Sequence, residues 1–130
     1  MVLVIMACCT LTLDVLLAGF SDSDWAGNLD DRRSITGYAF NIGFGVIAWS
    51  SKKQSTVALS SCEAEYQALC AATCEAIWLR RLLNDAGEEH NESTIIKTDN
   101  QSSIKLANSP VLHKNIDTQF HFVRENIQSK

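Results

Sequence analysis

The sequence predicts a mixed α/β domain, with three antiparallel strands first and then parallel strands with flanking helices. Three observations predict this class. Two β-rich runs between residues 35 and 50 flank a glycine-containing turn. From Cys62 onward, the apolar residues recur with the helical period of 3.6. A further β-rich run, Thr94–Thr98, follows that helix, and a strand reached through a helical crossover returns parallel to the sheet.

The first half of the chain contains the antiparallel strands. Leu13–Phe20 is expected to be a buried strand, because it is apolar and runs into the acidic segment SDSDWAG. For Met1–Cys9 a second strand and an unstructured segment both remain open. After polar, turn-like residues 28–33, Ile35–Ile42 alternates as a strand. The turn Gly43-Phe44-Gly45 then leads into the next strand, Val46–Ser50.

The second half is expected to be mainly helical. Ser60-Ser61-Cys62-Glu63 has the form of a capping box, which predicts a long helix from about Cys62 to Asp85 that stops at Gly87. The strand Thr94–Thr98 comes next, directly before Asp99. Two shorter helices are expected after it, over Gln101–Ala107 and over Ile116–Gln128.

Composition limits the class of protein. A chain of 130 residues with 46% apolar and 20% charged residues is typical of one globular domain. The net charge of −4 argues against a high-affinity nucleic-acid module, but it is compatible with an acidic catalytic domain. Five cysteines without a CxxC pair make a zinc site or a disulfide framework unexpected. No apolar run is long enough to predict a membrane span, and the three tryptophans are expected to pack in the core.

Two aspartates follow apolar strands directly. Asp22 comes after the predicted strand Leu13–Phe20, and Asp99 comes after Thr94–Thr98. The carboxyl ends of neighbouring strands in an α/β sheet are a common place for functional sites. Each aspartate also has an ordinary structural interpretation, because Asp22 could form a turn and Asp99-Asn100 could cap the following helix.

Glu65 is the third acidic residue of interest. On a helical projection it shares a face with apolar residues such as Leu69 and Leu79, whereas Glu63 projects with polar residues. A carboxylate on an apolar face is costly unless a partner compensates it, and the partner could be a lysine or a metal ion. Two strand-end aspartates facing this glutamate would form an oxygen-rich site of the kind that Mg²⁺ prefers.

Several long blocks resemble the ribonuclease H domain of copia-type LTR-retrotransposon Pol polyproteins: SDSDWAGNLDDRRSITGYAF, AWSSKKQSTVALSSCEAEYQAL, EAIWLRRLL and TDNQSSIKLANSP. The resemblance implies a ribonuclease H fold with a mixed five-stranded sheet and flanking helices. It implies metal-dependent cleavage of the RNA strand of an RNA–DNA hybrid, with Asp22, Glu65 and Asp99 as catalytic and metal-binding residues. The implied cofactor is Mg²⁺, with Mn²⁺ as a second option.

The resemblance also implies substrate contacts and partners. Gln101 matches a position that touches the hybrid in related ribonucleases H, and Ser23 and Asn100 are further candidates. The implied partners are the hybrid itself and the reverse transcriptase domain of the parent polyprotein, with no membrane. Reverse transcription places the expected location in the cytoplasm, with the nucleus as the alternative.

The sequence departs from the family pattern at both ends. Residues 1–12 are expected to be an atypical leader, and residues 13–130 a ribonuclease H-like domain without the family's last strand and helix. That missing part carries the fourth acid of the family. Asp117 could replace it, although an N-cap or first-turn role fits that residue better. The alternative function is therefore a non-catalytic, degenerate ribonuclease H-like remnant of such a polyprotein.

Overall fold

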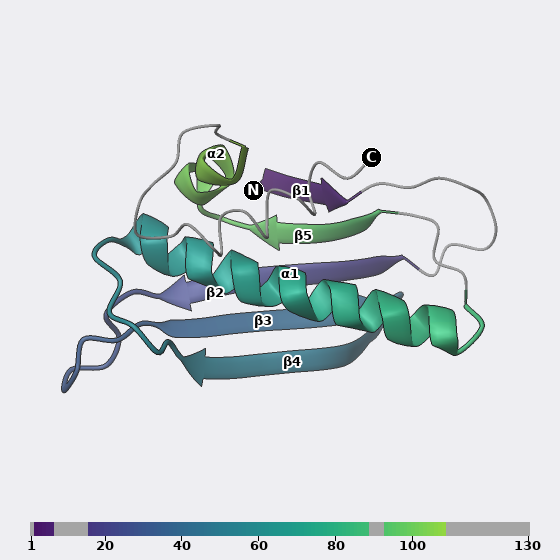
Figure 1. Ribbon diagram of the computed structural model, residues 1–130, viewed down its shortest axis with the longest axis horizontal. Coiled ribbons are helices and arrows are strands. Elements are labelled where there is room, and N and C mark those ends of the chain that lie inside the picture. The colour runs from purple at the N-terminus through teal and green to yellow at the C-terminus, as the bar shows by residue number, and fades with distance from the viewer. Residues whose placement is uncertain (1, 7–15, 89–92, 109–130) are drawn as a thin grey trace.

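A computed structural model describes residues 2–6, 16–88 and 93–108. These residues form one mixed five-stranded sheet and two helices (Figure 1). The strands are β1 (Val2–Met6), β2 (Leu17–Asp24), β3 (Ile35–Ile42), β4 (Gly45–Lys53) and β5 (Thr94–Thr98), and the helices are α1 (Ser61–Asp85) and α2 (Gln101–Asn108). The order across the sheet is β1-β5-β2-β3-β4. Helix α1 runs along one face of this sheet.

The sheet combines the two pairing directions that the sequence predicts. Strands β2, β3 and β4 form an antiparallel meander, and β5 lies parallel to β2 on its other side. The meander turns from β3 to β4 through Gly43 and Phe44, and Gly43 adopts a positive φ of 55° that favours glycine. Val2–Met6 forms an outer strand, antiparallel to β5. The mixed α/β class is therefore confirmed, but among the described residues only β5 pairs in parallel, with β2, where the sequence predicted parallel strands.

The boundaries of two strands differ from the prediction. Strand β2 is assigned from Leu17 to Asp24, and residues 13–15 lie outside the described part of the chain. It continues past the apolar run because it pairs with β3 along its whole length, from Leu17 opposite Ile42 to Asp24 opposite Ile35. Asp22 thus lies within a strand rather than after one. Strand β4 also extends further, to Lys53.

Helix α1 begins with the predicted capping box. The Ser60 hydroxyl accepts a hydrogen bond from the backbone N–H of Glu63 at 3.1 Å, and the Glu63 carboxylate accepts one from the N–H of Leu59 at 2.8 Å. Gly87, which has a φ of +87°, follows the last turn. These residues mark the start and the end of α1, and burial of its apolar stripe orients that face toward the sheet. The stripe holds Ala68, Leu69, Ala72, Ala76 and Leu79, all of them buried.

The core lies between α1 and the sheet. Phe40 on β3 is fully buried, and it packs over Gly19 on β2. A Cβ atom at Gly19 would lie 2.4 Å from Cε1 of Phe40, so only glycine fits at this crossing. Tyr66, Leu69 and Ile96 complete the centre of the core. The strands β2, β3 and β5 thereby pack tightly against α1.

The opposite face of the sheet carries exposed apolar side chains. Phe20 on β2 is 45% exposed, so the expectation of a buried strand through Phe20 is wrong for this residue. Trp49 on β4 projects from the same face, because it pairs through Ala39 with Phe20. Trp25, Trp49 and Trp78 are 51%, 76% and 56% exposed, so the expectation that the tryptophans pack in the core is also wrong. No other described residues bury these three tryptophan side chains.

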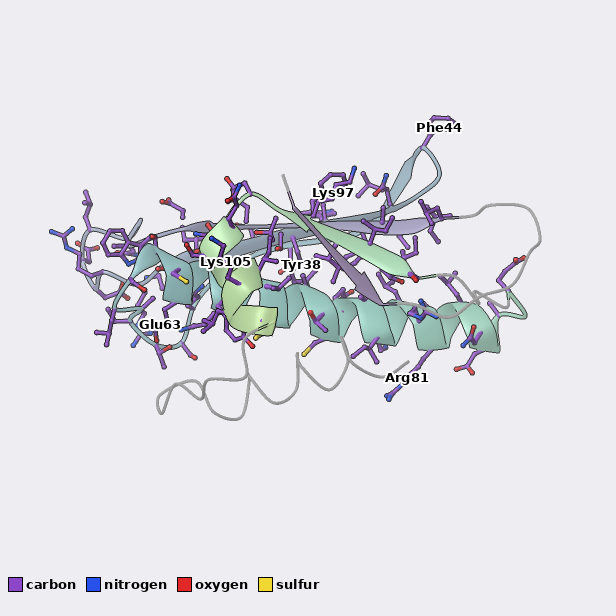
Figure 2. The ribbon with its side chains drawn as sticks, turned by 90° about the horizontal axis from the view of Figure 1, so that it is seen from above. Tyr38, Phe44, Glu63, Arg81, Lys97 and Lys105 are labelled. Carbon is purple, nitrogen blue, oxygen red and sulfur yellow. The ribbon has the colours of Figure 1, made fainter. Side chains whose placement is uncertain are left out.

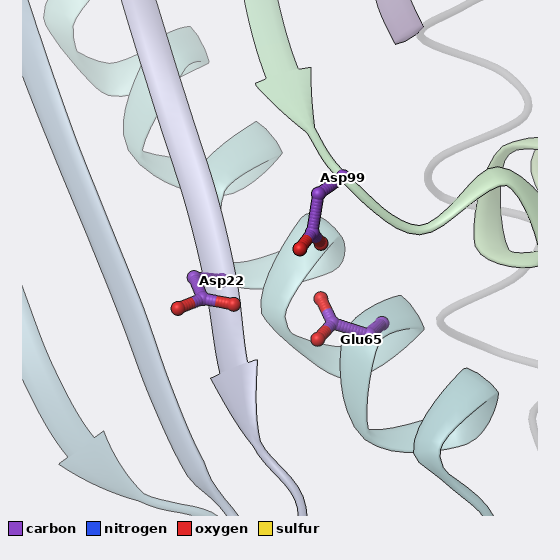
Figure 3. Close-up of side chains that lie close together, drawn as sticks. All are labelled: Asp22, Glu65 and Asp99. Carbon is purple, nitrogen blue, oxygen red and sulfur yellow. The ribbon is translucent and has the colours of Figure 1, made fainter. Parts of the chain in front are cut away.

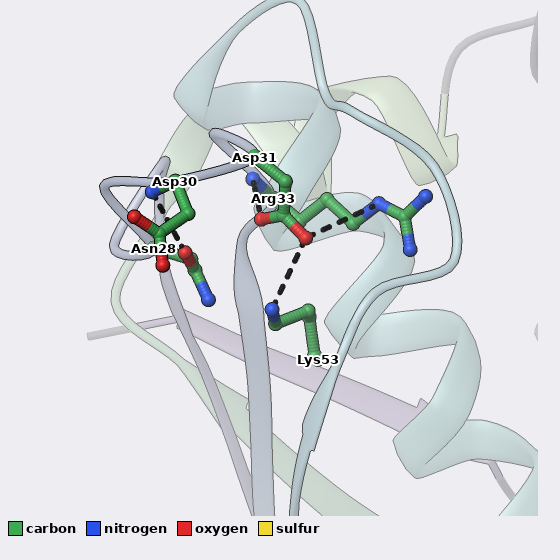
Figure 4. A network of polar contacts seen from close by, with 5 residues as sticks. All are labelled: Asn28, Asp30, Asp31, Arg33 and Lys53. Atoms are coloured by element: carbon green, nitrogen blue, oxygen red, sulfur yellow. Dashed lines mark hydrogen bonds and ion pairs between the residues drawn. The ribbon is translucent and has the colours of Figure 1, made fainter.

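A polar network holds the connection between β2 and β3 (Figure 4). The Asp31 carboxylate contacts the Lys53 ammonium at 3.1 Å and the Arg33 guanidinium at 3.8 Å. The hydrogen bond from Lys53 is the main reason that the pKa of Asp31 lies below its usual value. In the same connection, Asn28 accepts a hydrogen bond from the N–H of Asp30. These contacts fix the loop that follows the acidic end of β2.

Neither described helix is long and apolar enough to cross a membrane. The predicted helix Ile116–Gln128, together with Asp117, lies outside the described residues.

Candidate metal centre

The site lies where the pairing of β2 with β5 ends. The parallel ladder joins Ala18–Phe20 to Ile95–Lys97 and does not continue beyond Phe20 and Lys97. Asp22 and Asp99 each lie two residues beyond this last pair, so they stand opposite each other where the two strands are no longer bonded. The predicted placement of Asp99 directly after its strand is confirmed, because β5 ends at Thr98.

Glu65 reaches this gap from the second turn of α1. One carboxylate oxygen from each of Asp22, Glu65 and Asp99 can be chosen so that all three lie within 4.8 Å of one another. Figure 3 shows the three side chains pointing toward a common centre. The structure therefore brings together the three acids that the sequence singled out. Among the described residues, no other group of three or more His, Cys, Asp or Glu side chains lies close enough together to hold a metal ion.

The environment of Glu65 makes its charge costly in the metal-free protein. The residue is only 7% exposed, and its Oε2 atom is buried without a hydrogen-bond partner among the described residues. Burial, followed by the negative charges of Asp22 and Asp99, raises the pKa of Glu65 to about 7. A hydrogen bond from the backbone N–H of Ser23 opposes this shift in part. A cation between the three carboxylates would offset both effects, because its positive charge stabilises the ionised forms of all three groups.

The donor set fits a hard divalent cation. All three ligands are carboxylates, and Mg²⁺ binds oxygen ligands while keeping part of its water shell. Asp22 and Asp99 are exposed, so solvent has access to the centre from that side. The unpartnered Oε2 atom of Glu65 is the observation that favours an ion most strongly, because a buried acceptor without a donor is costly. The cluster could therefore hold a metal ion.

The predicted substrate contacts lie around this centre. The backbone N–H of Ser23 donates to Oδ1 of Asp22 at 2.8 Å. Asn100 is the N-cap of α2, because its Oδ1 accepts hydrogen bonds from the N–H groups of Ser102 and Ser103 at 2.9 and 3.0 Å. Gln101 is exposed on the first turn of α2. Ser23 thus follows Asp22 directly in the sequence, and Asn100 and Gln101 are the two residues that follow Asp99.

Two nearby acids do not join the cluster. The carboxylate of Asp24 lies so close to Gly27 that a Cβ atom there would overlap it. The carboxylate of Glu63 caps the N-terminus of α1 instead. The choice of Asp22 over Asp24 and of Glu65 over Glu63 therefore agrees with the geometry.

Sequence reasoning missed two side chains that border the cluster. A cavity of about 280 Å³ is lined by Phe20, Ser21, Asp22, Lys97, Thr98 and Asp99. The Lys97 ammonium lies over the Phe20 ring, 5.4 Å from its centroid. The sequence spacing could have predicted both positions. Side chains two residues apart in a strand share a face, and Phe20 and Lys97 precede Asp22 and Asp99 by two residues.

Comparison with known proteins finds similarity to polyprotein segments. No family model matches the chain. It is 41% identical over 120 residues, 90% of its length, to the retrovirus-related Pol polyprotein from transposon TNT 1-94 of Nicotiana tabacum. It is 40% identical over 116 residues to the corresponding polyprotein from transposon RE2 of Arabidopsis thaliana. The chain spans only 9% and 8% of the lengths of these relatives.

A third relative matches a shorter region. The chain is 59% identical over 63 residues to the secreted RxLR effector protein 161 of Plasmopara viticola, which covers 48% of this chain and 44% of that protein.

Proposed function

We propose, on the premise that this chain is homologous to a segment of copia-type retrotransposon Pol polyproteins, that it is a ribonuclease H-like domain. Its proposed activity is metal-dependent, endonucleolytic cleavage of the RNA strand of RNA–DNA hybrids. The proposed cofactor is Mg²⁺, which Mn²⁺ can replace. The observation that carries the proposal is the convergence of Asp22, Glu65 and Asp99 within 4.8 Å at the exposed end of two strands.

The fold supports this assignment in three respects. The antiparallel meander is followed by a strand, β5, that lies parallel to β2, as the family resemblance implies; the fifth strand, β1, is antiparallel and comes from residues outside the resemblance. Two of the acids come from neighbouring strands, and the third comes from the helix that packs across them. Asp22, Glu65 and Asp99 are separated by 43 and 34 residues along the chain. Chance is therefore a weak explanation for the proximity of their three carboxylates.

The roles of the residues follow from their positions. Asp22 and Asp99, which are exposed, would hold the metal from the two strands, and Glu65 would hold it from the buried side. When bound, divalent ions at such a site stabilise the charge that develops on the attacking and leaving oxygens of a phosphodiester. Glu65 would also accept a hydrogen bond from the attacking water and so orient that water toward the phosphate.

Substrate contacts are proposed for the residues next to the cluster. Gln101 offers an exposed side-chain amide two residues after Asp99. The Oγ atom of Ser23 is buried without a hydrogen-bond partner among the described residues, so Ser23 would contact the substrate only if this hydroxyl turned outward. The Oδ1 atom of Asn100 caps α2, which leaves its amide NH₂ group to face the substrate. The proposed partners are the RNA–DNA hybrid and the reverse transcriptase domain of the parent polyprotein.

A hybrid-cleavage assay tests the proposal. The purified chain is incubated with a labelled RNA–DNA hybrid and Mg²⁺ or Mn²⁺, beside the variants Asp99→Asn and Glu63→Gln. The control Glu63→Gln makes the same carboxylate-to-amide change as Asp99→Asn, at a residue whose carboxylate lies outside the cluster. We expect cleavage by the wild-type chain and by Glu63→Gln, and its loss in Asp99→Asn and after chelation of the metal.

Two outcomes would contradict the proposal in different ways. An absence of cleavage by the wild-type chain, with the hybrid still bound, would favour the non-catalytic remnant. Cleavage that Asp99→Asn leaves unchanged would show that the activity does not depend on this cluster.

A further inference from the structure

Lys97 is the positive charge that borders the carboxylate cluster. Phe20 and Lys97 are register partners at the last step of the β2–β5 ladder. Because strand residues two apart project from one face, Lys97 and Phe20 lie one row behind Asp99 and Asp22, about 7 Å back along the strands. Figure 2 shows Lys97 on the side of the sheet away from α1. The cation therefore stands on the open side of the site.

The position of the Lys97 ammonium is held by an aromatic ring rather than by an acid. It lies 5.4 Å from the centroid of Phe20, a distance at which a cation is attracted to a ring face. The two ion pairs between described residues, Arg33 with Asp31 and Lys53 with Asp31, both lie at the loop between β2 and β3, and neither includes Lys97. Lys97 thus borders the same cavity as Asp22 and Asp99 but forms no ion pair with either of them.

The space beside Lys97 is open to a ligand. The cavity of about 280 Å³ joins Phe20 and Lys97 to Asp22 and Asp99, so that a molecule bound at the acids also passes the ammonium. Phe20 is 45% exposed. An ammonium in this position is a compact charge with three donors, and backbone phosphates are its usual nucleic-acid partners.

We propose that Lys97, held over the ring of Phe20, binds a backbone phosphate of the substrate strand next to the phosphate that lies at the carboxylate cluster. This inference rests on the proposed function, because it names how the same site holds its nucleic-acid strand. Lys97 acts as a phosphate-binding residue and Phe20 as the residue that positions it. The contact also offsets part of the repulsion between an acidic protein and a polyanion.

The salt dependence of hybrid binding tests this contact. The dissociation constant of a short labelled RNA–DNA hybrid is measured by fluorescence anisotropy over a series of salt concentrations. Ca²⁺ replaces Mg²⁺ in these measurements, so that binding is recorded without relying on turnover. The variants are Lys97→Met, Lys97→Arg and Phe20→Leu, with Arg81→Met as the matched control. Arg81 lies about 24 Å further along the axis of α1 than Glu65, and it points away from the sheet (Figure 2).

The expected results separate the charge from the ring. Lys97→Met keeps an apolar side chain against Phe20 but removes the charge, so it should weaken binding about tenfold and reduce the salt slope by roughly one. Lys97→Arg should retain binding within about twofold, because it keeps a phosphate donor. Phe20→Leu should weaken binding with an unchanged salt slope. Arg81→Met should match the wild-type chain.

Each other outcome has a definite meaning. A wild-type dissociation constant and salt slope in Lys97→Met would overturn the inference, and so would an equal loss in Arg81→Met. Tighter Mg²⁺ binding by Lys97→Met with unchanged hybrid binding would overturn it as well, because Lys97 would then only balance the charge of the acids.

Two outcomes separate this inference from the proposed function. Hybrid binding by the wild-type chain without cleavage contradicts the proposed function alone. Cleavage by the wild-type chain with no effect of Lys97→Met contradicts this inference alone. Thermal unfolding of each variant confirms that it is folded.

Discussion

Asp22 and Asp99 stand opposite each other where the pairing between β2 and β5 stops, each two residues beyond the last paired residue of its strand. The end of the ladder opens the gap into which Glu65 projects from α1. Three carboxylates that are far apart in the sequence therefore meet without a basic residue between them. This arrangement is unfavourable for the metal-free protein, and the cost should be measurable.

The pH dependence of stability should report that cost. The pKa of Glu65 is about 7 in the folded chain and ordinarily 4.5, so the folded state binds this proton more tightly than the unfolded state. The stability that Glu65 contributes is then fully present below pH 4.5 and is lost as the pH rises through 7. The difference corresponds to roughly 3 kcal/mol, at about 1.4 kcal/mol per pKa unit. Urea unfolding in the presence of a chelator measures it.

Two comparisons identify Glu65 as the source of that pH dependence. Glu65→Gln should flatten the profile between pH 4.5 and 7 and should be more stable than the wild-type chain at pH 8. Adding Mg²⁺ to the wild-type chain should also raise its stability at pH 8, because a ligand that binds only the folded state stabilises it. Identical profiles for the wild-type chain and Glu65→Gln would contradict this explanation.

The crossing of Gly19 with Phe40 should tolerate no side chain on β2. Gly19→Ala would place a Cβ atom 2.4 Å from the Phe40 ring, and we expect it to lower the free energy of unfolding by about 1–3 kcal/mol. The matched control is Gly37→Ala, whose nearest neighbour would be the Asp22 carbonyl oxygen at 3.8 Å. That variant should change stability little.

A double-mutant cycle shows whether the overlap is the cause. Phe40→Leu makes room at the crossing, so it should cost less in the Gly19→Ala background than in the wild-type chain. Strictly additive losses, measured by chemical unfolding, would mean that Gly19→Ala acts in some other way.

Asn100 should contribute to stability through its cap. Asn100→Ala removes the acceptor of the Ser102 and Ser103 N–H groups, and we expect a loss of about 1 kcal/mol in unfolding free energy. Asn100→Asp keeps an acceptor and should retain most of that stability. If Asn100→Asp is as unstable as Asn100→Ala in thermal unfolding, the capping role is refuted. A higher KM for the hybrid in a stable Asn100→Asp variant would separately support a substrate contact.

Much of the candidate site could be predicted from local sequence patterns. Glu65 was recognisable because a helix has a fixed period, and an acid on the face of Leu69 and Leu79 conflicts with burial. Asp99 was recognisable because an apolar strand ends directly before it. The capping box of α1 was equally local, since Ser60 and Glu63 contact each other across three residues.

The features that depend on pairing between distant strands were harder to predict. The extension of β2 to Asp24 follows from its contact with β3, and no local pattern marks it. The exposure of Phe20 has a related cause, because α1 covers only one face of the sheet. An apolar side chain in a strand does not reveal which face will be covered. Lys97 was missed for the same reason, since its place beside the acids depends on the register between β2 and β5.

The most direct test of the account is to locate a bound ion at the carboxylates. Crystals of the chain soaked in Mn²⁺ would show that metal by its anomalous scattering. We predict an anomalous peak between Asp22, Glu65 and Asp99, within about 2.0–2.3 Å of oxygen atoms from these side chains. The peak should disappear in Asp99→Asn crystals treated in the same way. A fully soaked wild-type crystal without a peak at the three carboxylates would contradict the claim that they form one metal site.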